Sequence, residues 1–334
     1  YAIRKTLKLF MYDRQAGYIT IAVTALLTVM FGLNYAWVRV LVSLSAGMLM
    51  ENDRDRLGAE MAVMCLFRPY YVGSLSYLIP FGLRLLRLFQ GKYNVLHQFL
   101  YILVLDLYFY GYCDLLELLL FRPLGRVGSW MYLAALIMSF SPLSVNLSAA
   151  AGYYLSAADK LGGLEITGRP ALIAVLIMLA ALLKYAESGR LRSLTVYTAV
   201  LAISCLWRGL MPFYTVTQID VGQGDAALIS LPFSFEAIMI DTGGSLYRDV
   251  AHRQLIPYLK SMGVHSVSVI ISHDDHDHAG ALACLMEDFP VKTVYRENAA
   301  ELSICSLRIN QLLTDRKAES VNDNSLIDLF DIGR

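Results

Sequence analysis

The sequence predicts a polytopic α-helical membrane domain followed by a smaller α/β domain exposed to water. The 334-residue chain is 57% hydrophobic and 17% charged, and its mean hydropathy of +0.51 lies outside the range of ordinary soluble domains. Residues 15–38 and 127–158 carry no charge, whereas charged side chains recur every few residues from Gln218 onward. We therefore expect a transmembrane channel domain over residues 1–212 and an α/β domain over residues 213–334.

The apolar stretches of the first domain are long enough to cross a bilayer. A spanning helix needs about 20 residues. Residues 15–38 meet this length and residues 40–50 continue it, so the region forms one long span or two. Residues 127–158 suffice for a pair of spans divided at Pro142. Shorter candidates bring the expected number of helices to about six to eight, and they are residues 61–83, 95–121, 170–187 and 193–211.

Five charged side chains lie in apolar surroundings: Arg39, Arg68, Asp106, Asp114 and Glu117. A charge that faces lipid costs several kcal/mol, so such residues usually face a bundle interior or a watery cavity. We favour an interior position for Asp106. For Arg68 and Glu117, a position at the membrane interface fits equally well. Arg39 and Asp106 are the candidate functional polar residues of the membrane domain.

The charges around the last apolar stretch predict its orientation. Lys184, Arg190 and Arg192 precede this stretch, and only Arg208 follows it closely. Cytoplasmic loops carry an excess of lysine and arginine. The pattern places the loop over 184–192 in the cytoplasm. We therefore expect a multi-pass protein of the bacterial cytoplasmic membrane whose C-terminal domain lies on the outer face.

The periodicity of the sequence changes after Pro212. Alternating apolar residues separated by glycine turns indicate strands. A helix with one apolar face covers residues 249–262 and ends at Gly263, and a second helix covers residues 279–289. The expected strands are residues 214–220, 226–231, 237–240, 267–271, 291–295 and 325–330.

Three histidines and three aspartates follow directly on the fourth expected strand. In an α/β sheet, the loops at the C-terminal ends of the strands line the ligand cleft. The side chains of His273, Asp275, Asp277 and His278 can converge from one tight loop. His276 occupies a spacer position, where we expect it to face solvent or to support a ligand from behind.

The spacing suits two metal ions that share the loop. One ion would take His273 and Asp275 and the other Asp277 and His278, and each would need further ligands from elsewhere. Two divalent ions about 3.5–4 Å apart can activate a bridging water and stabilise an in-line displacement at phosphorus. The alternative is a solvated acidic turn with incidental histidines. We disfavour it because such a cluster serves no packing purpose.

The segment His273-x-Asp275-x-Asp277-His278 resembles the metallo-β-lactamase superfamily motif His-x-His-x-Asp-His, with aspartate in place of the second histidine. The resemblance implies a partial α/β domain of the αββα type. It also implies that these four residues bind metal and that Asp277 helps to orient the attacking water as a catalytic residue. A nitrogen and oxygen ligand set suits Zn²⁺ or Mn²⁺, and the ligand types do not distinguish the two.

Further segments are similar to the ComEC family of competence proteins, the bacterial DNA-internalisation channels. Three segments resemble parts of the C-terminal domain of that family. They are the turn Asp220-Val-Gly-Gln-Gly-Asp-Ala, the turn Ile240-Asp-Thr-Gly-Gly, and residues 322–326 (Asn-Asp-Asn-Ser-Leu). Val38-Arg39 followed by an apolar helix resembles its competence region. The supporting turn residues in this interpretation are Asp220, Gly222, Gly224, Asp225, Asp241 and Gly243; for Asp225 and Asp241 a role in stabilising the turns fits equally well.

The resemblance implies import of single-stranded DNA across the membrane during natural transformation, the establishment of competence. The metal domain would be a nuclease that hydrolyses the non-imported strand. The implied partners are DNA, membrane lipid and other proteins of the uptake machinery, and oligomer formation stays open. Two alternatives remain. One is a membrane-anchored metallohydrolase with a non-nucleic-acid substrate, and the other is a channel with an inactive, truncated metal domain.

Two expectations concern the ends of the chain. The first residues read as the interior of a longer protein, because they show neither an initiator methionine nor a cleavable signal. The last residue, Arg334, precedes the bridging carboxylate and the later histidine that the superfamily uses. We therefore expect the second half of the two-metal site to be missing here, which leaves enzymatic activity open for this chain.

Overall fold

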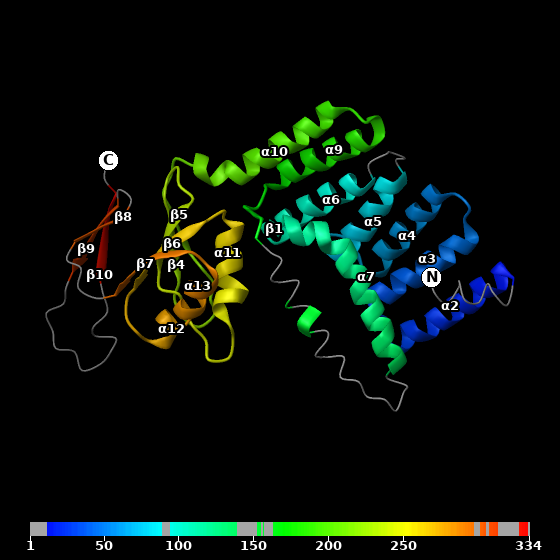
Figure 1. Cartoon of the computed structure of the whole chain (residues 1–334), viewed down its shortest axis with the longest axis horizontal. Helices are drawn as coiled ribbons and strands as arrows, with labels where there is room; N and C mark the ends of the chain where they lie inside the picture. The colour runs from blue at the N-terminus through cyan, green and yellow to red at the C-terminus, as the bar shows by residue number, and fades with distance from the viewer. Residues whose placement is uncertain are drawn as a thin grey trace. The chain divides into compact units, whose positions relative to one another are not determined.

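The computed structural model describes residues 12–88, 94–138, 152–154, 156, 163–296, 301–304, 307–312 and 327–332. Helices make up its first two thirds and a mixed sheet follows (Figure 1). The chain divides into two compact units: Tyr1–Ile102 with Ala181–Ser193, and Leu103–Ala180 with Leu194–Arg334. The second unit thus contains helical segments as well as the sheet, and the boundary near residue 212 stays a prediction.

The first unit begins with two helices where one long span was an alternative. Helix α2 (Asp13–Met30) ends at a turn in which Leu33 has a φ of 53°, and Asn34 caps the next helix by accepting from the Ala36 N–H at 3.0 Å. Helix α3 (Tyr35–Leu49) packs against α2. A buried row of threonines runs along α2: Thr20, Thr24 and Thr28. Each of the three hydroxyls donates to the backbone carbonyl four residues earlier, so none of these hydroxyls is left unpaired.

The expectation of a single span over residues 61–83 is wrong. Helix α4 (Asp53–Phe67) stops at Arg68, because the following Pro69 forces the residue before it out of the helical conformation. A short 3₁₀ turn follows, and helix α5 (Leu75–Leu88) begins after it. The core of this unit gathers side chains from α3, α4 and α5: Tyr35, Val38, Leu57, Met64, Tyr77 and Phe81.

A continuous span over residues 95–121 is likewise wrong. Helix α6 (Asn94–Phe109) ends before Gly111, whose φ is 82°, and strand β1 (Tyr112–Asp114) follows. Asp114 then caps helix α7 (Leu115–Met138), accepting from the Leu116 N–H at 2.8 Å. Strand β1 pairs with β2 (Glu165–Thr167), about fifty residues along the chain.

Hydropathy gives limited support to a polytopic arrangement. Among the described helices, only α10 (Leu191–Leu210) is both long and apolar enough to cross a membrane. Shorter apolar helices lie at Tyr35–Leu49 and Val95–Phe109. Helix α9 (Leu172–Ser188) matches the expected helix over 170–187. Half of the expected pair over 127–158, including residues 139–151, lies outside the described residues, so the number of spans stays a prediction.

The C-terminal sheet confirms the expected α/β pattern. Its strand order is β3-β4-β5-β6-β7, with antiparallel pairing up to β5 and parallel pairing from β5 onward. A separate antiparallel sheet, β10-β9-β8, contains two strands that the sequence did not predict. The bounds are β3 (Thr215–Gln218), β4 (Ala227–Ser230), β5 (Glu236–Ile240), β6 (Ser266–Ile271), β7 (Val291–Arg296), β8 (Glu301–Ile304), β9 (Leu307–Leu312) and β10 (Ile327–Ile332).

Helices cover one face of the five-stranded sheet. The helix predicted over 249–262 is a π-helical turn, Ala251–Leu255, that continues into α11 (Ile256–Ser261) and ends before Gly263. The helix predicted over 279–289 corresponds to α13 (Leu282–Asp288), and a short helix, α12 (His276–Ala279), forms in the last part of the segment that was expected to be a loop. Leucines of α11 and α13 pack with alternate residues of the strands, and burying each such side chain contributes about 1.5–3 kcal/mol. Figure 1 shows α11 and α13 beside the sheet. The core fixes the sheet edge where β5 and β6 end.

Helix α10 is attached to this sheet within the second unit. The Arg208 guanidinium, only 8% exposed, donates to the Ser230 hydroxyl and to the Glu236 carbonyl, each at 3.1 Å. Gly168, the residue after β2, is also held against α11, because its N–H donates to the Lys260 carbonyl at 3.0 Å. A buried arginine bonded in this way is hard to separate from its partners.

Candidate metal centre

Asp241 is the structural centre of the candidate site. It directly follows β5, and the parallel pairing of Ile240 with Ile270 brings it beside Ser272, the residue that follows β6. One Asp241 oxygen accepts from the Ser272 N–H and the other from the Ser272 hydroxyl, each at 2.7 Å. Asp241 is 4% exposed and has a φ of 57°, a left-handed conformation that aspartate tolerates better than most residues. The carboxylate thus holds the start of the segment over residues 272–278, the candidate metal-binding loop.

The same carboxylate orients His278. The Nδ1 atom of His278 lies 2.9 Å from the Asp241 oxygen that also accepts from Ser272. A carboxylate can only accept, so we assign the ring proton to Nδ1. The Nε2 atom then carries the lone pair and is free to bind a metal. Asp241 therefore sets the tautomer of this histidine.

His273 is oriented through Ser272. The Ser272 hydroxyl donates its only proton to Asp241, so it accepts from His273 Nδ1, which lies 3.0 Å away. His273 therefore also presents an unprotonated Nε2. The two imidazole rings lie 3.9 Å apart, centroid to centroid. One buried aspartate thus prepares both histidines as nitrogen ligands.

Each histidine Nε2 lies near one of the predicted carboxylates. His273 Nε2 is 3.6 Å from Asp275 Oδ2, and His278 Nε2 is 3.9 Å from Asp277 Oδ2. The histidine side chains are 9% and 16% exposed, whereas those of Asp275 and Asp277 are 41% and 57% exposed. The structure therefore brings the four predicted residues together as two pairs, each with one nitrogen and one oxygen donor.

The donor chemistry fits divalent metal, but the described residues do not complete a site. No group of three or more histidine, cysteine, aspartate or glutamate side chains in the described ranges is arranged to hold one ion. Neutral imidazole and carboxylate suit Zn²⁺ and Mn²⁺ alike. Two donors per ion are fewer than the three or four protein ligands of a typical zinc site. These residues can therefore supply only part of the ligand set.

Charge around His278 favours its protonated form in the absence of metal. Burial of the ring lowers its pKa, but the hydrogen bond to Asp241 and the negative charges of nearby aspartates outweigh burial. The pKa of His278 therefore lies above its ordinary value of 6.5. A metal ion at Nε2 would replace that proton.

Both predicted glycine turns contact the metal-binding loop. The Asp225 N–H donates to the Asp277 carbonyl at 3.2 Å, and the Thr242 N–H donates to the His278 carbonyl at 2.7 Å. Gly224 has a φ of 126°, and a Cβ there would lie 2.3 Å from the Asp277 carbonyl oxygen. Only glycine allows this approach. The turns therefore hold the loop backbone from two sides.

The other supporting turn residues act within the turns. The Asp220 carboxylate accepts from the Gly222 N–H at 3.1 Å, and the φ of Gly222 is 87°. Gly243 has a φ of 62°, and its carbonyl accepts from the Ala281 N–H at 3.0 Å. Asp225 presents its side chain to solvent. Residues 322–326, the last segment of the family resemblance, lie outside the described residues.

Sequence reasoning missed Ser272 and Gly244. A Cβ on Gly244 would lie 1.9 Å from the His276 carbonyl oxygen, so this glycine also permits the close approach of the loop. The signal for Ser272 was its place directly after β6, the parallel neighbour of β5, and the signal for Gly244 was its place at the end of the turn Ile240-Asp-Thr-Gly-Gly. His276 is exposed, as expected for a spacer residue.

The two polar candidates of the helical region have local partners. The Arg39 guanidinium donates to the Ser76 carbonyl at 2.7 Å. Asp106 lies on α6 in a partly buried position, with the Cys113 thiol 3.9 Å from its carboxylate. The partly buried position of Asp106 is compatible with the interior position expected for it, and the functional role of each residue stays a prediction.

Comparisons with known proteins support the resemblance. The model of the metallo-beta-lactamase superfamily matches residues 220–304, a range that includes the whole loop, and proteins of that superfamily use divalent metal. Recombination protein 2 of Haemophilus influenzae is 38% identical over 80 residues, which cover 24% of this chain and 10% of that protein. ComE operon protein 3 of Bacillus subtilis is 27% identical over 133 residues, or 36% of this chain and 17% of that protein. The chain thus spans a small part of either relative and is ComEC-like; no solved structure matches it significantly.

Proposed function

We propose that this chain belongs to a protein that takes up DNA through the bacterial cytoplasmic membrane. In this proposal the helical region conducts one DNA strand, and the domain over residues 213–334 hydrolyses the strand that is not imported. The main observation behind the proposal is the pair of histidines whose Nε2 atoms are left free for metal by a single buried aspartate. These histidines lie in the range matched by the superfamily model, and the chain is ComEC-like.

The chemistry follows from the orientation of the loop. Two divalent ions, Zn²⁺ or Mn²⁺, would supply a hydroxide nucleophile at neutral pH and neutralise charge on the phosphodiester. His273 with Asp275 would hold one ion and Asp277 with His278 the other. Asp277 is the more exposed carboxylate, at 57%, and would accept a hydrogen bond from the attacking water and orient it. Asp241 would hold the Nδ1 side of both imidazoles, directly at His278 and through Ser272 at His273, so that each Nε2 faces the metal.

The charge pattern supports a location on the outer face of the membrane. Helix α10 is the described helix best suited to span, and the basic residues cluster before it rather than after it. We place the loop over 184–192 in the cytoplasm and the metal domain outside. Protease added to intact cells should cleave the C-terminal domain; complete protection would overturn this placement.

A direct test measures hydrolysis by the full-length protein purified in detergent. Linear DNA with Mn²⁺ or Zn²⁺ should be degraded, and a chelator should abolish the activity. The variant Asp277→Asn keeps the side-chain volume and should lose about 10²–10⁴-fold in rate. Asp274→Asn is the matched control, because Asp274 lies on the same loop but is 68% exposed and pairs with Arg296 at 2.8 Å. Activity that resists the chelator would contradict the proposal.

One observation favours a second candidate, a membrane-anchored metallohydrolase with another substrate. An anchor needs a single spanning helix, and α10 is the one described helix that meets the criteria of length and hydropathy. Fold and metal loop are shared by many hydrolases. This candidate predicts metal-dependent hydrolysis of a small ester or phosphodiester by the same protein with no action on DNA.

A further inference from the structure

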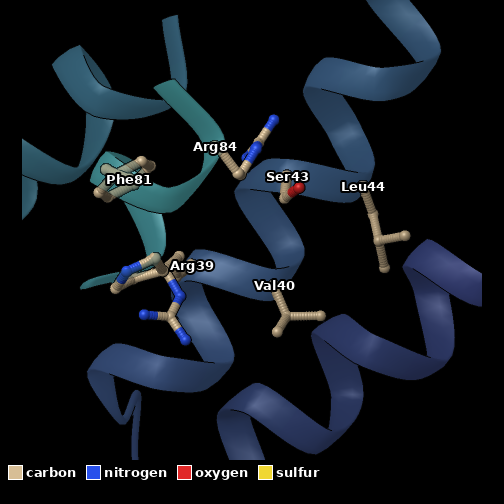
Figure 2. A pocket seen from close by; sticks show the side chains of 7 residues that line it. Arg39, Val40, Ser43, Leu44, Phe81 and Arg84 are labelled. Carbon is tan, nitrogen blue, oxygen red and sulfur yellow. The ribbon is translucent and has the colours of Figure 1, made fainter. Parts of the chain in front are cut away.

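Helices α3 and α5 of the first unit line an open cavity of about 220 Å³ that the proposed nuclease does not use (Figure 2). Its walls combine two arginines, Arg39 from α3 and Arg84 from α5, with aliphatic and hydroxyl side chains of α3. In Figure 2, Ser43 lies on α3 one turn beyond Arg39 and near Arg84. A cavity of this composition offers both hydrogen-bond donors and apolar contact.

Positive charge is in excess around the cavity. Glu60 of α4, whose side chain is 1% exposed, accepts from Arg84 Nη2 at 3.0 Å and from Arg56 Nε at 3.2 Å. No other carboxylate in the described residues lies within ion-pair distance of these arginines or of Arg39. Arg84 thus shares one carboxylate with Arg56, and among the described residues Arg39, the other arginine of the cavity wall, has no carboxylate within ion-pair distance. Uncompensated charge among apolar helices favours the binding of an anion.

The arginines keep donors for such an anion. A guanidinium has five N–H groups. Arg39 donates from Nη1 to the Ser76 carbonyl at 2.7 Å, and Arg84 donates from Nη1 and Nη2 to Glu60. The remaining N–H groups have the planar fork geometry that suits phosphate oxygens. The Ser43 hydroxyl adds a neutral donor on the same wall.

The apolar lining indicates which phosphate fits. Val40, 43% exposed, and Leu44 continue the cavity wall along α3, where they offer contact for a hydrocarbon chain. Phe81 is 2% exposed, so its ring is not free to stack on a nucleobase, the contact that single-stranded nucleic acid usually takes. Basic pockets between membrane helices favour acidic headgroups. The chemistry thus favours a lipid over a nucleic acid.

We propose that this cavity binds the phosphate of an anionic phospholipid. Arg39 and Arg84 hold the phosphate oxygens from facing helices, Ser43 donates a further hydrogen bond, and an acyl chain lies along Val40 and Leu44. The site stands independently of the proposed nuclease, since it involves neither the metal-binding loop nor its domain.

The test uses the full-length protein reconstituted in bilayers of phosphatidylglycerol and phosphatidylcholine, followed by gentle extraction and mass spectrometry of the lipid that stays bound. Wild-type protein should retain phosphatidylglycerol in preference to phosphatidylcholine. Arg39→Gln should lower that retention about tenfold, the effect of losing a charge-assisted hydrogen bond of about 1.4 kcal/mol. Arg39 is the chosen position because removing Arg84 would leave the buried Glu60 with fewer partners and could disturb folding.

The controls separate the sources of phosphate. Arg54→Gln alters an exposed arginine of α4 outside the cavity and should retain lipid as the wild type does. Equal retention of both lipids, or unchanged retention in a folded Arg39→Gln variant, would overturn the proposal. Displacement of the lipid by millimolar inorganic phosphate would assign the cavity to free phosphate instead. Displacement by a single-stranded oligonucleotide would assign it to nucleic acid.

Discussion

At the scale of single residues, Asp241 carries more of the site than its place in a glycine turn suggests. From the sequence, a role in stabilising the turn and a position near the metal site were both open. The structure shows both at once, because the carboxylate accepts from Ser272 and from His278 Nδ1. A supporting carboxylate of this kind fixes ring orientation and ligand basicity. The free Nε2 atoms of the loop therefore depend on a residue outside it.

Asp241→Asn tests this dependence. Asparagine can still accept from the Ser272 N–H, but its amide N–H₂ would face His278 Nδ1 and move the ring proton to Nε2, where a metal must bind. Metal affinity should fall about 10–100-fold with little change in the thermal midpoint of unfolding. Calorimetric titration of the full-length protein with Mn²⁺ or Zn²⁺ measures the affinity. Asp249→Asn, in an exposed carboxylate outside the loop, is the control; equal affinities in the two variants would contradict the role of Asp241.

His252 predicts a pH-dependent contribution to stability. Hydrogen bonds to Asp288 at 2.5 Å and to Asp249 at 2.7 Å raise the pKa of His252 above 6.5. A raised folded-state pKa stabilises the fold below pH 6.5, and this contribution is lost as the pH rises through the folded-state value. The ring is 43% exposed, so the contribution should stay below about 1 kcal/mol. His252→Gln should lower the thermal midpoint at about pH 5.5 and leave it unchanged at about pH 8.5; a larger difference at the higher pH would refute the assignment.

At the scale of elements, the register of β5 and β6 makes the site. Their parallel pairing brings the turn after Ile240 against the loop after Ile271, although about thirty residues separate them. Close contact then requires residues without a side chain. Gly244 meets the His276 carbonyl, and Gly224 meets the Asp277 carbonyl. The glycine turns are therefore part of the architecture of the candidate metal site.

Gly244→Ala should displace the loop, because the new Cβ would lie 1.9 Å from the His276 carbonyl oxygen. We expect a loss of roughly 1–3 kcal/mol in stability, as for other overpacked sites, together with weaker metal binding. Denaturant unfolding and metal titration of one sample measure both effects. Gly58→Ala provides the control, since Gly58 lies inside α4 with open space around it, and alanine there should be neutral or slightly stabilising. If Gly244→Ala behaves like Gly58→Ala, the close approach is wrong.

Local pattern predicted the elements of the sheet well and the breaks between helices poorly. Alternation and glycine turns located the strands from β3 to β7 because each strand is a short, continuous segment with its own signal. The pairing of Cys113 with Ile166 joins segments that local periodicity cannot connect, so an apolar run was read as one span. The sequence did not predict the hydrogen bonds of the Asp241 carboxylate for the same reason, because its partners follow a neighbouring strand.

At the scale of the whole molecule, composition predicted two chemically different regions, and the structure has a helical region followed by the mixed sheet. Composition did not predict that Arg208 of α10 would be buried against β4 and β5. Such contacts depend on tertiary packing, which hydropathy does not encode.

In the proposed function, the metal site that contains the loop over 273–278 hydrolyses one DNA strand while the other strand is imported. The most direct measurement uses a naturally transformable cell from which its own copy of the gene has been removed. The cell expresses the full-length protein and is supplied with linear DNA that carries a different label in each strand. We predict that wild type and Asp274→Asn release one label as small fragments outside the cell and import the other, whereas Asp277→Asn releases at least about a hundredfold fewer fragments. Fragment release at the wild-type rate by Asp277→Asn, at equal protein level, would contradict the claim.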